Sequence, residues 1–276
     1  MTANSSTIST IVINSVPIAV RDTAEADLPV VLALHSLFLD GRMFEEFTAA
    51  ARGVFRVVSP DFRGQGLSGM VDADIVDMDT HAADIEQLIE RLGLQDINLL
   101  AQSMGGDVGL RVVHRNPELF SSVALIGSSA RSEPGEKHAS LDAWVETITA
   151  EGFTGETLEE TLRIMFGTTT RSNPSQAENM AMWRSWIAEA GRNLAPQLAG
   201  VNARGSLLEV LPEITVPTLV ICGEEDVARP PAWSEEIADR MPRAELVVMA
   251  GIGHSPILED PGTVIPHLLA FFAQSQ

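Results

Sequence analysis

The stretch from Ile97 to His114 constrains the fold of this chain more than any other segment. A short apolar run, Ile97 to Ala101, stops at the polar residues Gln102 and Ser103. Small residues follow at once, and helical spacing resumes from Val108. This pattern predicts a strand, a tight turn and a helix. A serine at the apex of such a turn exposes its hydroxyl beside a helix N-terminus, where the helix dipole favours negative charge. Ser103 is therefore a candidate nucleophile.

The sequence Ala101-Gln102-Ser103-Met104-Gly105 resembles the nucleophile elbow of the α/β-hydrolase fold, Gly-x-Ser-x-Gly, with alanine in place of the first glycine. A match of this kind is weak alone, because a serine often caps a helix that follows a strand. Asp226 and His254 extend the resemblance, since each follows a predicted strand and the chain order Ser, Asp, His is the one that this family uses. The resemblance implies a nucleophile at Ser103, a general base at His254 and an orienting acid at Asp226. Glu225 is the rival acid.

A second loop carries the same resemblance. Pro29 to Leu34 is a continuous apolar run, typical of an inner strand covered on both faces, and it ends at His35-Ser36-Leu37. In α/β-hydrolases this loop supplies one backbone amide of the oxyanion hole, so Leu37 and Met104 are the implied donors. We expect His35 to be structural. The loop is also similar to the Asn-Ser-Leu of 3-oxoadipate enol-lactonases, a local likeness that leans towards lactonases.

Apolar runs that alternate with helical patterns predict an α/β fold with a mostly parallel central sheet flanked by helices. Ile8 to Val20 alternates loosely and predicts an antiparallel hairpin at a sheet edge. The further strands are expected within 54–61, 123–126, 215–223 and 244–249, with a helix from Asp79 to Gly93 and a last helix from Val264 to Phe272. Residues 1–129 and 206–276 would form this core.

Residues 130–205 show amphipathic helical patterns where a sheet protein would return to its next strand, and they resemble the helical cap of the family. Such a cap roofs the active site. Apolar residues that could form a binding wall are Phe38, Trp144, Phe166, Met182, Trp183 and Trp186. For any single one of them, packing between helices is the commoner role. An apolar cap favours a largely uncharged substrate. A dianionic one would require Arg163, Arg171 or Arg184 to face inward.

Composition narrows the partners. The chain has 38 acidic and 18 basic residues, for a net charge of −20, which disfavours nucleic acid and anionic membranes. Cys222 is the single cysteine, so no disulfide or zinc cluster can form within the chain. Met1 to Thr10 lacks the pattern of a secretory signal, and no apolar window is long enough to span a membrane. We expect a cytoplasmic protein with a small-molecule substrate; a homodimer is left open.

The family resemblance implies a hydrolase that cleaves a small to medium carboxylic ester or lactone through an acyl intermediate on Ser103, with neither a metal nor an organic cofactor. Epoxide hydrolases and dehalogenases of this fold use an aspartate where this chain has a serine. Three alternatives stay open on the same scaffold, since fold does not name function. They are a carbon–carbon bond hydrolase, a cofactor-free perhydrolase and a non-catalytic ligand receptor.

Overall fold

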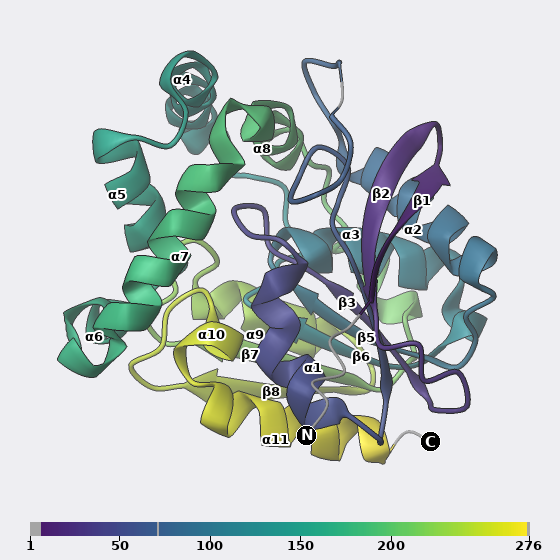
Figure 1. The fold of residues 1–276 in the computed structure, drawn as a ribbon. Helices are drawn as coiled ribbons and strands as arrows, with labels where there is room; N and C mark the ends of the chain where they lie inside the picture. The colour runs from purple at the N-terminus through teal and green to yellow at the C-terminus, as the bar shows by residue number, and fades with distance from the viewer. Residues whose placement is uncertain (1–6, 71, 275–276) are drawn as a thin grey trace.

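The computed structural model describes residues 7–70 and 72–274. Its centre is an eight-stranded sheet with the order β1-β2-β4-β3-β5-β6-β7-β8 (Figure 1). The strands are β1 (Thr7–Ile13), β2 (Val16–Asp22), β3 (Val30–Leu34), β4 (Arg56–Pro60), β5 (Ile97–Gln102), β6 (Phe120–Ile126), β7 (Thr218–Gly223) and β8 (Ala244–Met249). β1 pairs antiparallel with β2 and β2 with β4, whereas every pair from β4 to β8 is parallel. The predicted α/β class, the mostly parallel sheet and the edge hairpin are confirmed.

The inner strands are mostly apolar because helices cover both faces of the sheet. Every residue of β3, β5 and β7 is buried. A strand with water on one face would alternate apolar and polar residues instead. β5 lies between β3 and β6, so the turn that follows it is at the middle of the sheet.

Helices form layers on the two faces of the sheet (Figure 1). α1 (Glu45–Ala51) and α11 (Pro261–Ala273) contact each other on one face. α2 (Met78–Leu92) and α3 (Met104–Arg115) contact each other on the other, and α9 (Pro231–Arg240) packs on β7 and β8. The Asp77 carboxylate caps α2, two residues before the predicted start, by accepting a hydrogen bond from Thr80 N at 2.7 Å. Within the described residues, no helix is both long and apolar enough to cross a bilayer.

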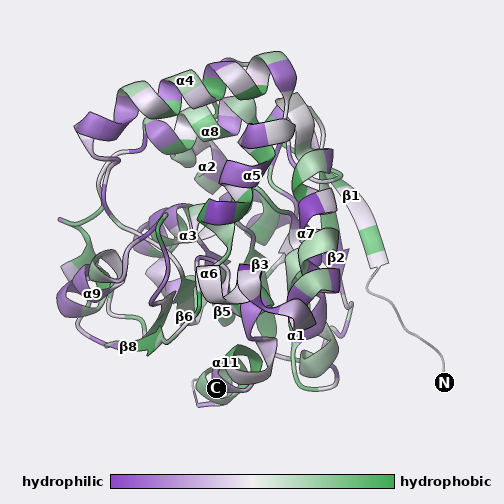
Figure 2. Ribbon diagram, turned by 90° about the vertical axis from the view of Figure 1, so that its left-hand side faces the viewer, coloured by the Kyte–Doolittle hydropathy of each residue, from purple (hydrophilic) through white to green (hydrophobic). Residues whose placement is uncertain are grey.

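A group of helices lies between β6 and β7 and sits together over one end of the core (Figure 2). They are α4 (Gly135–Glu151), α5 (Gly155–Met165), α6 (Thr168–Ser172), α7 (Ala177–Ala190) and α8 (Ala195–Asn202). The short α6 was not expected from the sequence, whereas the other helices fall where amphipathic patterns predicted them. We call this group the cap; its limits at residues 130 and 205 stay a prediction.

α8 docks the cap directly on the core. Gly200 faces the loop before α2 so closely that a Cβ at this position would lie 1.8 Å from the Val76 carbonyl oxygen. The Val76 N–H in turn donates to the Pro196 carbonyl at 2.9 Å. Only glycine allows the helix to approach this backbone.

Three aromatic rings pack in a row beneath the loops that follow β3 and β4. The Phe62 ring lies 4.7 Å from the His35 ring and 5.0 Å from the His81 ring, between centroids. His35 Nε2 accepts from the Phe62 N–H at 2.9 Å, so its Nδ1 carries the proton and donates to the Ser36 carbonyl at 2.8 Å. The expectation that His35 is structural is confirmed, because its hydrogen bonds tie the two loops together. Burial lowers the pKa of His35, and lowers that of His81 to about 3.

Gly200→Ala should destabilise the protein, because the new methyl group meets a carbonyl that cannot move aside. Overpacking costs about 3 kcal/mol at the upper end, and the better helix propensity of alanine offsets about 1 kcal/mol. We expect a melting temperature about 4–8 °C lower, measured by circular dichroism. The matched control is Gly135→Ala, which has open space for a Cβ and should melt at or slightly above the wild-type temperature. Equal melting of both variants would show that α8 does not rest on this loop.

His81 should make stability depend on pH. The folded protein keeps His81 neutral, while in the unfolded chain its pKa is the ordinary value near 6.5, so the unfolded state gains a proton first as the pH falls. The contribution of the neutral His81 to the free energy of unfolding is therefore complete above pH ~6.5 and decreases below it. The decrease is about 2 kcal/mol between about pH 7.5 and about pH 5. Urea unfolding at these two pH values should show that His81→Phe loses about 2 kcal/mol less unfolding free energy than wild type between them. His267→Gln, at an exposed position, should behave like wild type; an unchanged slope in His81→Phe would contradict the assignment.

Candidate active site

Ser103 occupies a strained turn between β5 and α3. Its backbone has φ 54° and ψ −115°, a region that non-glycine residues rarely adopt. The Ser103 N–H donates to the Ile126 carbonyl of β6 at 2.9 Å, which anchors the turn to the neighbouring strand. A Cβ at Gly105 would lie 2.2 Å from the Leu34 carbonyl, and one at Gly106 would lie 2.1 Å from Ser128 Oγ. These glycines let α3 start directly against β3 and the end of β6, which holds the turn in place.

The structure brings Ser103, His254 and Asp226 into one hydrogen-bonded chain. Ser103 Oγ lies 2.8 Å from His254 Nε2, and His254 Nδ1 lies 2.8 Å from Asp226 Oδ2. The other oxygen, Asp226 Oδ1, accepts from the backbone N–H groups of Ala228 and Arg229 at 2.9 and 2.8 Å. All three side chains are buried. An imidazole held between a hydroxyl and a carboxylate can accept the hydroxyl proton and stay oriented as it becomes charged.

Glu225, the rival acid, points away from His254. Its carboxylate accepts from the Thr169 N–H at 2.9 Å and from Thr169 Oγ1 at 2.6 Å. These hydrogen bonds lower the pKa of Glu225, because they stabilise the ionised form. Of the two neighbouring carboxylates, one therefore meets the histidine and the other holds the cap residue Thr169.

The His254 loop is held by a carboxylate that the sequence analysis did not single out. Glu259 accepts from the N–H groups of Gly253 and Ser255, on either side of the histidine, at 3.1 and 3.0 Å. It also accepts from the cap groups Gly167 N at 2.9 Å and Thr170 Oγ1 at 2.6 Å. The only sequence signal for this role was that Glu259 lies five residues after His254. The four donors that it binds come from two segments far apart in the chain.

The predicted oxyanion donors, Leu37 and Met104, both lie at the Ser103 pocket. Met104 is the first residue of α3, where a backbone N–H has no partner within the helix. Leu37 follows the His35-Ser36 segment that the ring stack fixes, and both residues line the pocket that contains Ser103. Whether their amides bind an oxyanion stays a prediction.

The pocket at Ser103 has a volume of about 150 Å³, with Ser103 and His254 in its wall. Phe38 and Trp144, two of the predicted wall residues, line it together with Leu141, Ile164, Met165, Leu198 and Val201. The rings of Phe38 and Trp144 also contact each other, with centroids 5.5 Å apart. The aromatic wall therefore comes from the loop after β3 and from α4 of the cap.

The other four predicted wall residues lie elsewhere. Phe166 and Trp183 stack on each other at 4.6 Å, buried between cap segments, because each large ring is the other's packing partner. Met182, which precedes Trp183 on α7, is 42% exposed and faces outward. Trp186 lines a separate depression and lies 4.9 Å beneath the Arg42 guanidinium. The amphipathic pattern predicted that these residues are buried or face other cap elements, but no residue of α7 lines the Ser103 pocket.

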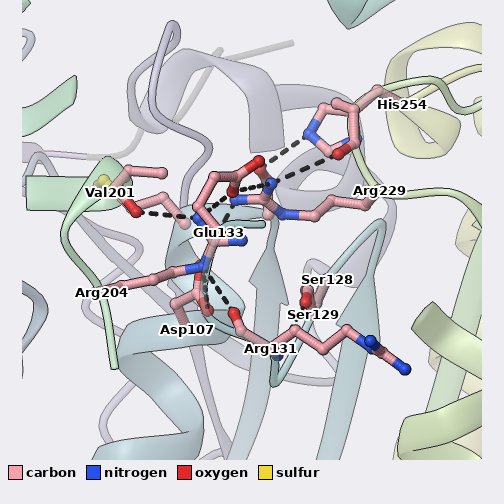
Figure 3. Close-up of polar contacts among 12 residues, drawn as sticks. Asp107, Ser128, Ser129, Arg131, Glu133, Val201, Arg204, Arg229 and His254 are labelled. Carbon is pink, nitrogen blue, oxygen red and sulfur yellow. Dashed lines mark hydrogen bonds and ion pairs between the residues drawn. The ribbon is translucent and has the colours of Figure 1, made fainter. Parts of the chain in front are cut away.

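A buried cluster of charges adjoins His254 and was missed at the level of sequence. Arg204 and Arg229 approach Glu133 and Asp107 from opposite sides (Figure 3). Burial raises the pKa of Asp107 and lowers that of Arg229. The cap arginines that the sequence pointed to lie on the outside instead. Arg163 pairs with Glu156 and Glu160, Arg184 with Glu159, and Arg171 with the Phe166 carbonyl.

Comparison with known proteins identifies the family to which this architecture belongs. A model of the alpha/beta hydrolase fold family matches residues 29–261. The chain is 29% identical to a non-heme chloroperoxidase of Kitasatospora aureofaciens, over 81% of this chain and 84% of that protein. Among solved structures it is similar to a thermophilic esterase from Thermogutta terrifontis, with a TM-score of 0.88 and 27% identity over 98% of this chain and 99% of the other. An enol-lactonase from Burkholderia xenovorans shares the fold, with a TM-score of 0.88 and 23% identity over 96% of this chain and 100% of that one. The chain belongs to the α/β-hydrolase fold family.

Proposed function

We propose that this protein is a serine hydrolase that cleaves a small carboxylic ester or lactone through an acyl-Ser103 intermediate. The observation that carries the proposal is the position of His254, 2.8 Å from Ser103 Oγ on one side and 2.8 Å from Asp226 Oδ2 on the other. A serine hydroxyl becomes a useful nucleophile only when a base removes its proton, and this geometry supplies the base and its orienting acid.

The residues would divide the reaction between them. His254 takes the Ser103 proton as Oγ attacks the carbonyl carbon, and then gives it to the leaving alcohol. Asp226 holds the imidazole in the tautomer that accepts from Ser103 and stabilises its cation. The N–H groups of Leu37 and Met104 stabilise the oxyanion, by about 3 kcal/mol per donor. Water, activated by His254 in turn, releases the acid.

Pocket size and the named relatives support a small substrate. A volume of about 150 Å³ accommodates a short acyl group but not a long chain, unless the cap moves. The solved neighbours include an esterase and an enol-lactonase, and the ring of a lactone reacts by the same acyl transfer. The chloroperoxidase name of one relative supports perhydrolase activity as a second candidate. There, peroxide would replace water in attacking the acyl group.

Replacing Ser103 with alanine should remove hydrolysis of p-nitrophenyl acetate and butyrate, and of a small lactone. We expect kcat to fall at least about 10³-fold, because no nucleophile remains. A fluorophosphonate probe should add to the wild-type protein at one site, mapped to Ser103 by mass spectrometry. Ser172→Ala, in the cap, is the matched control and should keep wild-type rates. Equal rates in Ser103→Ala and wild type would refute the proposal, and peroxide-dependent halide oxidation with acetate would indicate the perhydrolase.

The adjacent carboxylates permit a sharp test of the acid. Asp226→Asn should lower kcat about 10³–10⁴-fold with little change in folding, because the amide favours the wrong tautomer of His254. Glu225→Gln, one residue away, should stay within about threefold of wild type, because the Glu225 carboxylate hydrogen-bonds to Thr169 of the cap and not to His254. Steady-state kinetics on p-nitrophenyl acetate measures both. The opposite order of losses would make Glu225 the acid.

A further inference from the structure

The wall of the Ser103 pocket carries positive charge in a protein that is strongly acidic. The whole chain has a net charge of −20, yet the pocket is lined by Lys137 and Arg229 against a single carboxylate, Glu133. Long-range repulsion from the acidic surface works against an anionic ligand. Cations in the pocket wall therefore call for an explanation in the contacts made there.

Arg204 already neutralises Glu133. Its side chain has no exposure to solvent, and its Nη1 lies 2.6 Å from Glu133 Oε2. Nε donates to the Arg131 carbonyl and Nη1 to the Val201 carbonyl, each at 2.9 Å, and Nε also lies 3.5 Å from Asp107 Oδ1. Arg204 Nη2 makes no hydrogen bond among the described residues. These contacts identify Arg204 as the structural partner of Glu133, behind the pocket wall.

Arg229, by contrast, lacks a close partner. Its nearest carboxylate oxygens are Glu133 Oε2 at 3.5 Å and Asp107 Oδ2 at 3.7 Å, and its contact with the Ala228 carbonyl is 3.4 Å long. Its Nε makes no hydrogen bond within the described part of the chain, and neither does Asp107 Oδ2. A guanidinium that is only 6% exposed normally makes several short hydrogen bonds, because leaving its N–H groups unpaired is costly. Arg229 therefore has hydrogen-bonding capacity left for a ligand.

Lys137, an exposed residue, brings a second cation to the pocket wall. Its Nζ lies 5.7 Å from the centre of the Trp233 ring, and the Arg229 guanidinium lies 5.6 Å from the centre of that same ring. Among the described residues Lys137 is paired with no carboxylate. The cations Arg204, Arg229 and Lys137 thus lie near three carboxylates, those of Asp107, Glu133 and Asp226. The Asp226 oxygens are already used on His254 and two backbone amides.

We infer that the substrate carries a free carboxylate, which Arg229 receives with the help of Lys137 while the ester carbonyl lies at Ser103. Among the described residues Arg229 Nε has no hydrogen-bond partner, and a guanidinium binds a carboxylate through parallel hydrogen bonds. The substrate class is then a half-ester of a short dicarboxylic acid, or a lactone that bears a carboxylate. This inference rests on the proposed acyl transfer at Ser103, and it replaces the expectation of a largely uncharged substrate.

The test compares kcat/KM for a charged ester and its uncharged isostere, monoethyl succinate and ethyl 4-methylpentanoate, by pH-stat. We expect wild type to prefer the half-ester about tenfold or more, as befits a charge-assisted hydrogen bond in a buried wall. Arg229→Met should lower this preference by at least about tenfold, and Arg229→Lys should recover part of it. Arg184→Met, at an exposed cap arginine, is the matched control and should keep the wild-type preference.

A second measurement covers the case in which Arg229→Met does not fold. Hydrolysis of p-nitrophenyl acetate by wild type should be inhibited by succinate at about tenfold lower concentration than by butyrate, and Lys137→Met should narrow that difference. If wild type hydrolyses the uncharged ester at least as well as the half-ester, or if folded Arg229→Met keeps the wild-type preference, the carboxylate site is refuted and acyl transfer at Ser103 stands. Loss of hydrolysis of every ester, the uncharged one included, would refute the proposed function itself.

Discussion

The close approach of α3 to the strand ends is the constraint on which the site depends. Gly105 and Gly106 bring the helix against the Leu34 carbonyl and Ser128, and this contact leaves Ser103 no room for an ordinary backbone conformation. The strain at Ser103 is therefore maintained by the packing of three central strands and one helix. The same packing places the start of α3 and Ser103 together in the wall of the pocket.

Carboxylates next to the proposed catalytic residues hold the cap in register with the core. Glu225 precedes Asp226 and binds Thr169, whereas Glu259 follows His254 and binds Gly167 and Thr170. The loops that carry the acid and the base are thus fastened to the same short segment of the cap. Movement of that segment would shift the loops that hold Asp226 and His254, so the cap and the proposed triad are directly connected by hydrogen bonds.

Charge is distributed unevenly between the surface and the site. The exposed Arg163 is paired with Glu156 and Glu160 of its own helix, and the exposed Arg184 of α7 with Glu159 of α5; exposed ion pairs of this kind contribute little to stability. Buried charges are costly unless they are well paired, so the loosely paired Arg229 stands out against the tightly held Arg204. A bound carboxylate would complete the pairing that the protein leaves unfinished.

Much of the fold could be predicted from the sequence, because periodicity and turn residues act locally. The apolar runs identified the strands, Gly93 ended α2, and the residues around Ser103 predicted the elbow that the structure contains. The spacing of Asp226 and His254 after strands also placed them at one edge of the sheet, since the carboxyl ends of parallel strands meet there.

Tertiary structure alone decided the choices between neighbours and between faces. Which of Glu225 and Asp226 meets His254, and which aromatic residues of the cap face Ser103, depend on contacts between segments far apart in the chain. The role of Arg229 was hidden for the same reason, because Glu133, Lys137 and Asp107 come from other elements. Local patterns determine which elements form and where they end; the packing of those elements determines which side chains meet.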